Sequence, residues 1–232
     1  MAFTYASDIS KPGSLSFMSQ SGGHLSQLLN IGYKRDMRFR FGISFGNQID
    51  LNSTDFLKFF RSDDKTKVIC AYLESFGSGN GHDFYLELKK TAKLKPVIIW
   101  KGGYTEEGNR AAFSHTGAIS SELKLWKSMA KQTGAILVKD NEEWWNTIKT
   151  FEILYPNLIP KGNSIAIVTP GGGASVNFTD LFSSHNLNIP SLSENIQEEL
   201  QKILPKENVI IENPIDLGAS GFIVNLYLQV IK

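Results

Sequence analysis

Several features are scarce in this 232-residue chain, and each absence excludes a class of protein. Cys70 is the only cysteine, so no disulfide forms within the chain and no zinc site is built from cysteines. Charge of one sign is also lacking, because 24 basic and 23 acidic side chains leave a formal net charge of +1. That balance gives no electrostatic reason to expect a nucleic-acid or membrane partner.

Targeting and nucleotide-binding signals are missing as well. No uncharged apolar run approaches the roughly 20 residues that span a bilayer, and the N-terminus lacks the order of a signal peptide. No glycine turn is followed by the Gly-Lys-Ser/Thr of a Walker loop, and "GSGNGH" (Gly77–His82) has the wrong spacing for a dinucleotide fingerprint. We therefore expect a cytoplasmic protein without a metal site, which does not bind nucleotide tightly by itself.

What the sequence does contain is a regular alternation of short apolar runs and longer amphipathic segments. This order is typical of a parallel sheet with helices on both faces. After Lys139, Asp140 is expected to cap a helix, with Glu143 at the capping-box position and Trp144 in its apolar stripe. The predicted strands are Leu15–Ser19, Arg40–Phe45, Val68–Glu74, Val97–Lys101, Ala135–Lys139 and, further on, Ser164–Thr169.

The segment "YPNLIPKGN", rich in proline and glycine, is the best candidate for a domain boundary. We expect an N-terminal tail over residues 1–12 and a flavodoxin-like α/β domain over residues 13–158. A second α/β unit is expected over residues 159–232. It contains few strands on which its helices can pack, which predicts an incomplete unit.

Glycines and polar residues follow the predicted strands where a parallel sheet places its ligand-binding edge. "QSGG" follows the first strand, "GNQID" the second, and Glu74 ends the third. The fourth leads to "RAAFSHTGAIS", in which His115 stands among small residues that cannot bury it. A simple turn explains any one of these glycines, but their convergence on one edge favours a binding site. His24 is expected to cap a helix at the surface, and Lys101 to be a strand-end charge.

The sequence also carries a weak internal repeat. "SFMSQSGGHLS" and "AIVTPGGGASV" share an apolar strand, a hydroxyl residue, two further positions, paired glycines and a helix. Ser19 thereby matches Thr169, and Gly22–Gly23 match Gly172–Gly173. Glycines let backbone N–H groups approach a ligand closely, and each helix start adds about half a positive charge. Two such starts aimed at one point are suited to hold a phosphoryl group.

These motifs resemble the nucleoside-diphosphate-forming acyl-CoA synthetases, which include succinyl-CoA synthetase and the ADP-forming acetyl-CoA synthetases. The resemblance runs from about Gly13 to the C-terminus. It rests on "FMSQSGG", "SFGNQID", "YLE", "KGGYTEEGNRAAFSHTGA", "IVTPGGGAS" and "ENPIDLGAS", in that order. It implies that His115 is phosphorylated during turnover, that Glu74 orients its ring, and that the second unit belongs to the same superfamily.

The resemblance also implies an acid–thiol ligase that interconverts acyl-CoA, ADP and phosphate with carboxylic acid, CoA and ATP. CoA, phosphate and Mg-ADP or Mg-ATP are then substrates, and no cofactor is tightly bound. A CoA-binding domain and an ATP-grasp domain or β subunit are the implied partners in an oligomer, so the chain alone is expected to be inactive. The assigned residues are His115 and Glu74 for catalysis, Ser21, Gly22, Gly23, Gly171, Gly172 and Gly173 for phosphate, and Gly46, Asn47, Asp50, Asn213 and Asp216 for substrate loops.

An alternative function belongs to a different class. Copies of this fold in some protein acetyltransferases sense ligands and perform no synthetase chemistry, and such a regulatory module need not keep the histidine. The presence of both His115 and Glu74 favours the enzyme. Asn213 and Asp216 are equally well explained by an extended turn.

Overall fold

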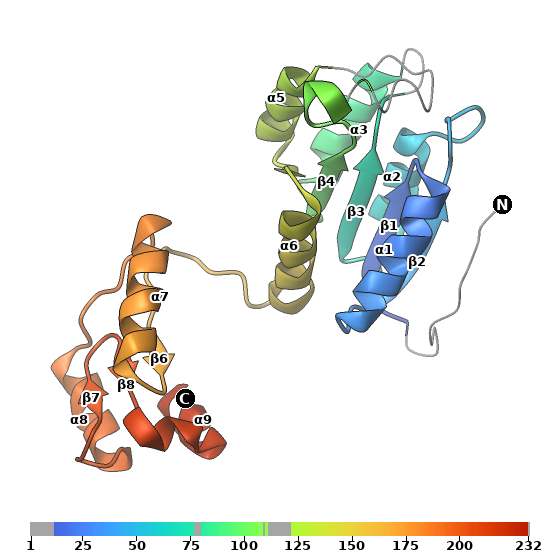
Figure 1. The fold of residues 1–232 in the computed structure, drawn as a ribbon. Helices are drawn as coiled ribbons and strands as arrows, with labels where there is room; N and C mark the ends of the chain where they lie inside the picture. The colour runs from blue at the N-terminus through green and yellow to red at the C-terminus, as the bar shows by residue number, and fades with distance from the viewer. Residues whose placement is uncertain (1–11, 77–79, 109, 111–121, 232) are drawn as a thin grey trace. The chain divides into compact units, whose positions relative to one another are not determined.

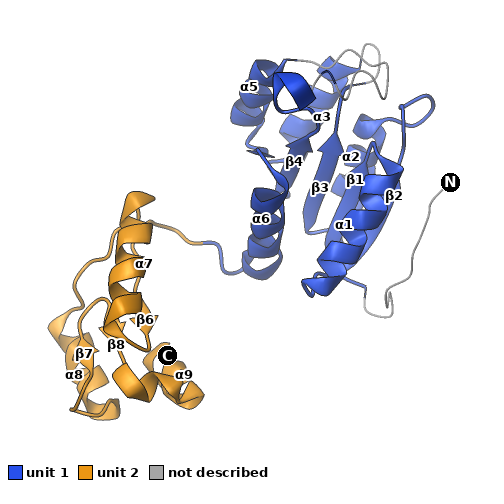
Figure 2. Cartoon of the chain, in the orientation of Figure 1, with its two compact units in different colours: residues 1–159 blue, residues 160–232 orange. Residues whose placement is uncertain are grey.

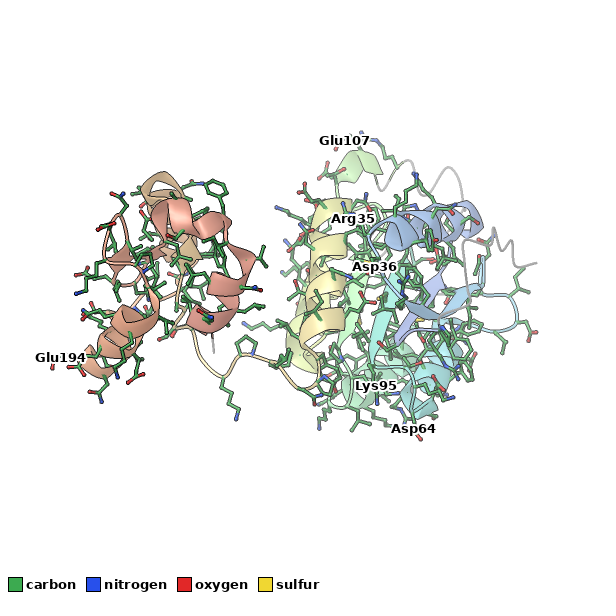
Figure 3. All side chains as sticks on the ribbon, turned by 90° about the horizontal axis from the view of Figure 1, so that it is seen from below. Arg35, Asp36, Asp64, Lys95, Glu107 and Glu194 are labelled. Carbon is green, nitrogen blue, oxygen red and sulfur yellow. The ribbon has the colours of Figure 1, made fainter. Side chains whose placement is uncertain are left out.

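The computed structural model describes residues 12–76, 80–108, 110 and 122–231. The chain forms two compact units, Met1–Ile159 and Pro160–Lys232, which are coloured separately in Figure 2 and are described one at a time. Charged side chains such as Arg35, Asp64 and Glu194 lie exposed on them (Figure 3). Among the described residues, no helix has the length and apolar character needed to cross a membrane.

The first unit is built on a five-stranded sheet in the order β2-β1-β3-β4-β5, in which every neighbouring pair is parallel. This strand order is that of the flavodoxin-like folds, so the predicted fold class is confirmed. The strands are β1 (Leu15–Ser19), β2 (Phe39–Ser44), β3 (Val68–Leu73), β4 (Val97–Lys101) and β5 (Ile136–Val138). The described helices of this unit are α1 (Gly22–Lys34), α2 (Ser53–Ser62), α3 (Gly81–Thr91), α5 (Leu123–Thr133) and α6 (Asn141–Leu154).

Helices cover both faces of this sheet (Figure 1). Side chains of α1 and α6, such as Leu28 and Trp144, pack with Phe17 and Cys70 on one face. Side chains of α2, α3 and α5 pack with alternate strand residues on the other face. Both faces of β1 and β3 are therefore buried, which explains the uninterrupted apolar sequence of β3, whereas β1 also buries the polar residues Ser16 and Ser19. Cys70 is fully buried in this core.

The helix after β5 begins as predicted. The Asp140 side chain accepts the Glu143 N–H at 2.9 Å. The Glu143 carboxylate accepts the Lys139 N–H at 2.8 Å. In a capping box it would accept the N–H of the N-cap residue, Asp140, which is the next residue along the chain. Trp144 and Ile148 are buried, and so is Trp145, which the predicted stripe omitted.

The second unit has a three-stranded sheet in the order β6-β8-β7, with β6 (Val168–Thr169) parallel and β7 (Ile210–Ile211) antiparallel to β8 (Ile215–Asp216). Its described helices are α7 (Gly172–Ser184), α8 (Glu194–Ile203) and α9 (Val224–Ile231), with the 3-10 helix η1 (Gly218–Phe222) before α9. The strands β7 and β8 were not predicted. They contain only two residues each, too few for a periodic pattern.

The prediction of a six-residue strand over Ser164–Thr169 was wrong, because only Val168 and Thr169 join the sheet. The reason is the Asn213 side chain. Its Oδ1 accepts the Ile167 N–H at 3.0 Å, and its Nδ2 donates to the Ile165 carbonyl at 2.8 Å. A side chain thus satisfies backbone groups that a neighbouring strand would otherwise bond.

Candidate functional site

The turns that follow β1, β2, β3 and β4 meet at one edge of the first sheet, because all the strands are parallel. Backbone hydrogen bonds join them just beyond the strand ends: Phe45 N–H to Ser19 O at 3.1 Å, Gln20 N–H to Tyr72 O at 3.0 Å, and Gly102 N–H to Leu73 O at 2.8 Å. The prediction that these polar turns converge is therefore confirmed. This carboxyl edge is where ligands bind in open α/β sheets.

Two buried glutamines hold the turns together. Gln20 Oε1 accepts the N–H groups of Glu74 and Ser75 at 2.9 and 3.1 Å, and its Nε2 donates to Ser75 Oγ at 3.1 Å. Gln48 Nε2 donates to the Ser75 carbonyl at 2.9 Å, and its Oε1 accepts the Ser53 N–H at 3.1 Å. The backbone of Glu74 and Ser75 is consequently bonded from the turns that follow β1 and β2. Sequence reasoning missed both glutamines, although each stands in a motif that it singled out.

The Glu74 side chain lies beside Tyr72 and Gly102. The Tyr72 hydroxyl donates to Glu74 Oε1 at 3.3 Å. Burial raises the pKa of Tyr72 well above its usual value, and the adjacent Glu74 carboxylate raises this pKa further, so the hydroxyl stays a donor. A Cβ on Gly102 would lie 2.6 Å from the Tyr72 hydroxyl and 2.9 Å from Glu74 Cγ. Glycine at this position therefore leaves room for the carboxylate and its partner.

Lys101 is fully buried at the end of β4, where a simple strand-end charge was expected. Its Nζ donates to the carbonyl oxygens of Gly102 and Gly103, both at 2.8 Å. Burial lowers the pKa of Lys101, and the negative charge of Glu74 partly counteracts that shift. The buried ammonium thus shapes the glycine turn after β4 and lies close enough to Glu74 to sense its charge.

His24 does not cap a helix at the surface, contrary to expectation. Its ring centroid lies 4.3 Å from that of Tyr72 and 4.9 Å from that of Trp100. Burial lowers the pKa of His24, so the ring is neutral at pH 7. The His24 ring reaches from the first turn of α1 to the aromatic side chains of β3 and β4.

A cavity of about 300 Å³ opens beside these rings. It adjoins the turn after β4 and the start of α6. Its lining comprises His24, Tyr72, Trp100, Lys101, Gly102, Gly103, Tyr104, Thr105, Gly108, Lys139, Asp140 and Asn141.

The start of α1 offers backbone donors to a ligand. Ser21 is the N-cap, and its hydroxyl accepts the His24 N–H at 3.3 Å. Gly22 and Gly23 form the first turn and are exposed. Within the described part of the chain, a Cβ on Gly23 would meet no atom within 4 Å, so internal packing does not require a glycine there. An external group that approaches the backbone closely would require one.

The start of α7 has the same local architecture, which supports the internal repeat. Ser19 Oγ donates to the Ser21 carbonyl at 2.8 Å, and Thr169 Oγ1 donates to the Gly171 carbonyl at 3.2 Å. Gly171 is the N-cap of α7, and Gly172 and Gly173 begin the helix. One difference is Asp216, whose Oδ2 lies 3.4 Å from the position of a Cβ on Gly172.

The remaining assigned loop residues have varied surroundings. Gly46 has a φ of 59°, a left-handed conformation that favours glycine. Asn47 and Asp50 are exposed around the buried Gln48. Asn213 uses its amide on backbone groups, as described above, and Asp216 Oδ1 accepts the Gly218 N–H at 2.8 Å. His115 lies outside the described residues, so its place beside Glu74 stays a prediction.

Comparison with known proteins agrees with this geometry. Residues 12–151 match the model of the succinyl-CoA ligase like flavodoxin domain. The chain is 34% identical over 213 residues to the acetate–CoA ligase [ADP-forming] II subunit alpha of Pyrococcus furiosus, covering 92% of this chain and 45% of that protein. It is 32% identical over 214 residues to the acetate–CoA ligase [ADP-forming] of Methanocaldococcus jannaschii, covering 92% of this chain and 29% of that protein.

Among solved structures, the fold is similar to a Ca. Korarchaeum cryptofilum dinucleotide forming acetyl-coenzyme A synthetase 1, determined in complex with phosphate and ADP. The TM-score is 0.79 at 34% identity, over 89% of this chain and 44% of that one. The chain thus spans less than half the length of the curated relatives that it matches. With its parallel sheet, its glycine turns and this match over residues 12–151, the chain belongs to the succinyl-CoA ligase like flavodoxin domain family.

Proposed function

We propose that this chain is the phosphohistidine-carrying part of an ADP-forming acyl-CoA synthetase, with His115 as the phosphorylated residue. The observation that carries the proposal is the position of Glu74. Gln20 fixes its backbone, Tyr72 bonds its carboxylate, and Gly102 makes room for it at the start of the segment that leads to His115. A carboxylate bonded to one nitrogen of an imidazole leaves the other nitrogen free to attack phosphorus.

The proposed reaction runs in three balanced steps. Phosphate attacks the thioester carbon of acyl-CoA, the C–S bond breaks, and CoA leaves as the thiol with an acyl phosphate as product. A ring nitrogen of His115 then attacks phosphorus, the P–O bond to the acyl oxygen breaks, and the carboxylic acid is released. Finally, the β-phosphate oxygen of ADP takes the phosphoryl group from the histidine, which forms ATP and regenerates the imidazole.

The helix starts are suited to the phosphoryl group that passes between these steps. N–H groups of Gly22 and Gly23 have no acceptor within the described part of the chain, and the α1 dipole adds partial positive charge there. Gly172 and Gly173 begin α7, and in this proposal they too offer backbone donors to phosphate. The α7 start is the weaker of the two, because the Asp216 carboxylate beside Gly172 repels an anion.

Substrates and partners follow from the same proposal. CoA, phosphate and Mg-ADP are the proposed substrates of the complete enzyme, and a CoA-binding domain and an ATP-grasp domain or β subunit are the proposed partners. The named relatives support this proposal, because they are acetate–CoA ligases [ADP-forming]. Turnover in an oligomer with these partners, and none by the isolated chain, is the expected behaviour.

Phosphorylation of His115 is the direct test. The chain is mixed with an ATP-grasp partner subunit and Mg-[γ-³²P]ATP, and acid-labile label on the chain is followed over time. His115→Ala should abolish the label and Glu74→Gln should slow its appearance at least tenfold. His82→Ala, a change at an exposed histidine, should leave the label unchanged.

Two outcomes would contradict the proposal. Acid-labile label that persists in His115→Ala would place the phosphoryl group on another residue. Complete absence of label in the unmodified chain, with an active partner subunit, would favour the ligand-sensing module.

A further inference from the structure

The turn after β2 contains a buried polar residue in a strained conformation. Gln48 has a φ of 62°, in the left-handed region that residues other than glycine rarely adopt. Its neighbours Asn47 and Ile49 are exposed, whereas Gln48 is only 8% exposed. Strain of this kind persists only where surrounding contacts hold it in place, and it gathers at functional sites. The contacts of the Gln48 side chain therefore indicate what the strained turn supports.

Both ends of the Gln48 side-chain amide are bonded. Its Oε1 accepts the Ser53 N–H at 3.1 Å, and its Nε2 donates to the Ser75 carbonyl at 2.9 Å. Ser53 begins α2, whose N-terminus Asn52 closes with a complete capping box. One side of the amide is thus attached to a well-capped helix, and the other side holds the turn after β3.

Ser75 is the residue at which the two buried glutamines meet. Gln20 bonds the N–H and the hydroxyl of Ser75, and Gln48 bonds its carbonyl. The same Gln20 oxygen that accepts the Ser75 N–H also accepts the N–H of Glu74. Ser75 is 4% exposed, so without Gln48 its carbonyl would lose a donor in a place where water does not readily replace it.

We propose that Gln48 is a positioning residue for Glu74 and acts through Ser75. By fixing the Ser75 carbonyl, Gln48 keeps Ser75 where Gln20 bonds it, and the Gln20 oxygen then holds the backbone of Glu74 in place. The Glu74 carboxylate is thereby kept where it orients the imidazole of His115. The inference rests on the proposed function for the role of Glu74.

Two variants of the full chain test this role with the ATP-grasp partner subunit and labelled Mg-ATP. Gln48→Gly fits the left-handed backbone but lacks the amide, and Gln48→Met keeps most of the side-chain volume without the donor and acceptor. Both should slow phosphorylation of His115 at least threefold, and label at the unmodified rate in both would overturn the proposal. Asp36→Gly is the matched control. Asp36 also has a left-handed φ, 55°, but it lies between α1 and β2, at the opposite edge of the sheet from Glu74, so its change should leave the rate unaltered.

A double-mutant cycle separates positioning of Glu74 from general damage to the fold. If Gln48 acts through the Glu74 carboxylate, Gln48→Gly should cause no further slowing in a chain that already carries Glu74→Gln. Equal slowing by Gln48→Gly with and without Glu74→Gln would overturn the proposal, because the glutamine would then act independently of the carboxylate.

Hydrogen exchange of the full chain alone provides a readout that does not depend on the proposed function. In Gln48→Gly, the amide hydrogens of Glu74 and Ser75 should exchange at least fivefold faster, while that of Cys70 within β3 serves as the reference for global opening. Unchanged exchange at Glu74 and Ser75, relative to Cys70, would overturn the inference whatever the phosphorylation result. Faster exchange at these two residues, in a chain that takes no label even when unmodified, would overturn the proposed function and leave the hold of Gln48 on Glu74 standing.

Discussion

The side-chain oxygen of Gln20 accepts the backbone N–H of Glu74 at 2.9 Å. Gln20 stands between β1 and the start of α1 at Gly22. Its buried side-chain amide therefore links the backbone of Glu74, which we assign to catalysis, to the turn that leads to Gly22 and Gly23, which we assign to phosphate binding.

Removal of this amide should cost stability and disturb Glu74. Gln20→Ala leaves the buried N–H groups of Glu74 and Ser75 without their acceptor, which we expect to lower the free energy of unfolding by about 1–3 kcal/mol. Urea unfolding followed by tryptophan fluorescence measures this change, because all four tryptophans lie in the first unit. Gln132→Ala is the control, since Gln132 bonds Tyr85 at the exposed surface. Equal effects of the two changes would contradict the prediction.

Two glycines of α1 should respond to alanine in opposite ways. Gly23→Ala meets no described atom within 4 Å and should raise the free energy of unfolding by about 0.5 kcal/mol, yet slow phosphorylation of His115 if the backbone there approaches a phosphoryl group. Gly32→Ala places its Cβ 2.3 Å from the Phe39 ring and should destabilise the first unit by about 1–3 kcal/mol. Phosphorylation by Gly23→Ala at the unmodified rate would argue against a phosphate site at this turn.

The ion pair between Arg40 and Asp63 should make stability depend on pH. The Arg40 guanidinium lowers the pKa of Asp63 to about 2, and hydrogen bonds from Thr66 to the Asp63 carboxylate also lower it. Burial of Asp63 acts in the opposite direction and raises its pKa. The pKa of Asp63 is lower in the folded chain than in the unfolded chain, where it is near 4. The ion pair therefore contributes fully to stability at pH values above about 4, and this contribution is lost as the pH falls toward 2. The side chains of Arg40 and Asp63 are 27% and 16% exposed, so solvent screening limits the contribution to about 1–2 kcal/mol.

Unfolding at two pH values checks this. Asp63→Asn should be less stable than the unmodified chain at pH 6, and the difference should shrink at pH 2.5. Asp64→Asn, at the exposed neighbouring position, should show no such difference (Figure 3). A difference between Asp63→Asn and the unmodified chain that is constant with pH would rule out the ion pair as its source.

The charge of Glu74 should be detectable at Lys101. Glu74→Gln removes the carboxylate that raises the pKa of Lys101, so burial should lower this pKa further. Nuclear magnetic resonance of ¹³C-labelled lysine side chains, titrated through the alkaline range, measures the shift. Lys95 is an internal reference: burial lowers its pKa too, but its charged neighbours include Asp63 and not Glu74. No movement of the Lys101 titration in Glu74→Gln would show that the two charges do not interact.

Local patterns predicted most of the first unit. β1 and β4 have the expected bounds, and Asp140 caps α6 as the sequence indicates. These features depend on apolar periodicity and on groups three or four residues apart. The prediction of where the polar turns converge needed only the parallel direction of the strands.

Features that depend on distant partners escaped prediction. Gln20 and Glu74 are 54 positions apart, and Asn213 bonds Ile165 across 48. No sequence spacing reveals that an amide replaces a strand in pairing with Ile165 and Ile167, which is why the second sheet begins later than expected. Likewise, the partial burial of His24 on α1 depends on Tyr72 and Trp100, which come from two strands.

The full burial of β1 has a consequence for amide hydrogen exchange. All five of its residues are buried, and it is bonded on both sides, to β2 and to β3. Amides in such a central strand exchange only through large-scale opening, whereas those of the two-residue strands β6–β8 exchange through local fluctuations. The turn at Gln20 directly continues β1. The donor groups of α1 therefore follow a strand that is bonded on both sides, and those of α7 follow a two-residue strand, so we expect the amides before α1 to exchange more slowly than those before α7.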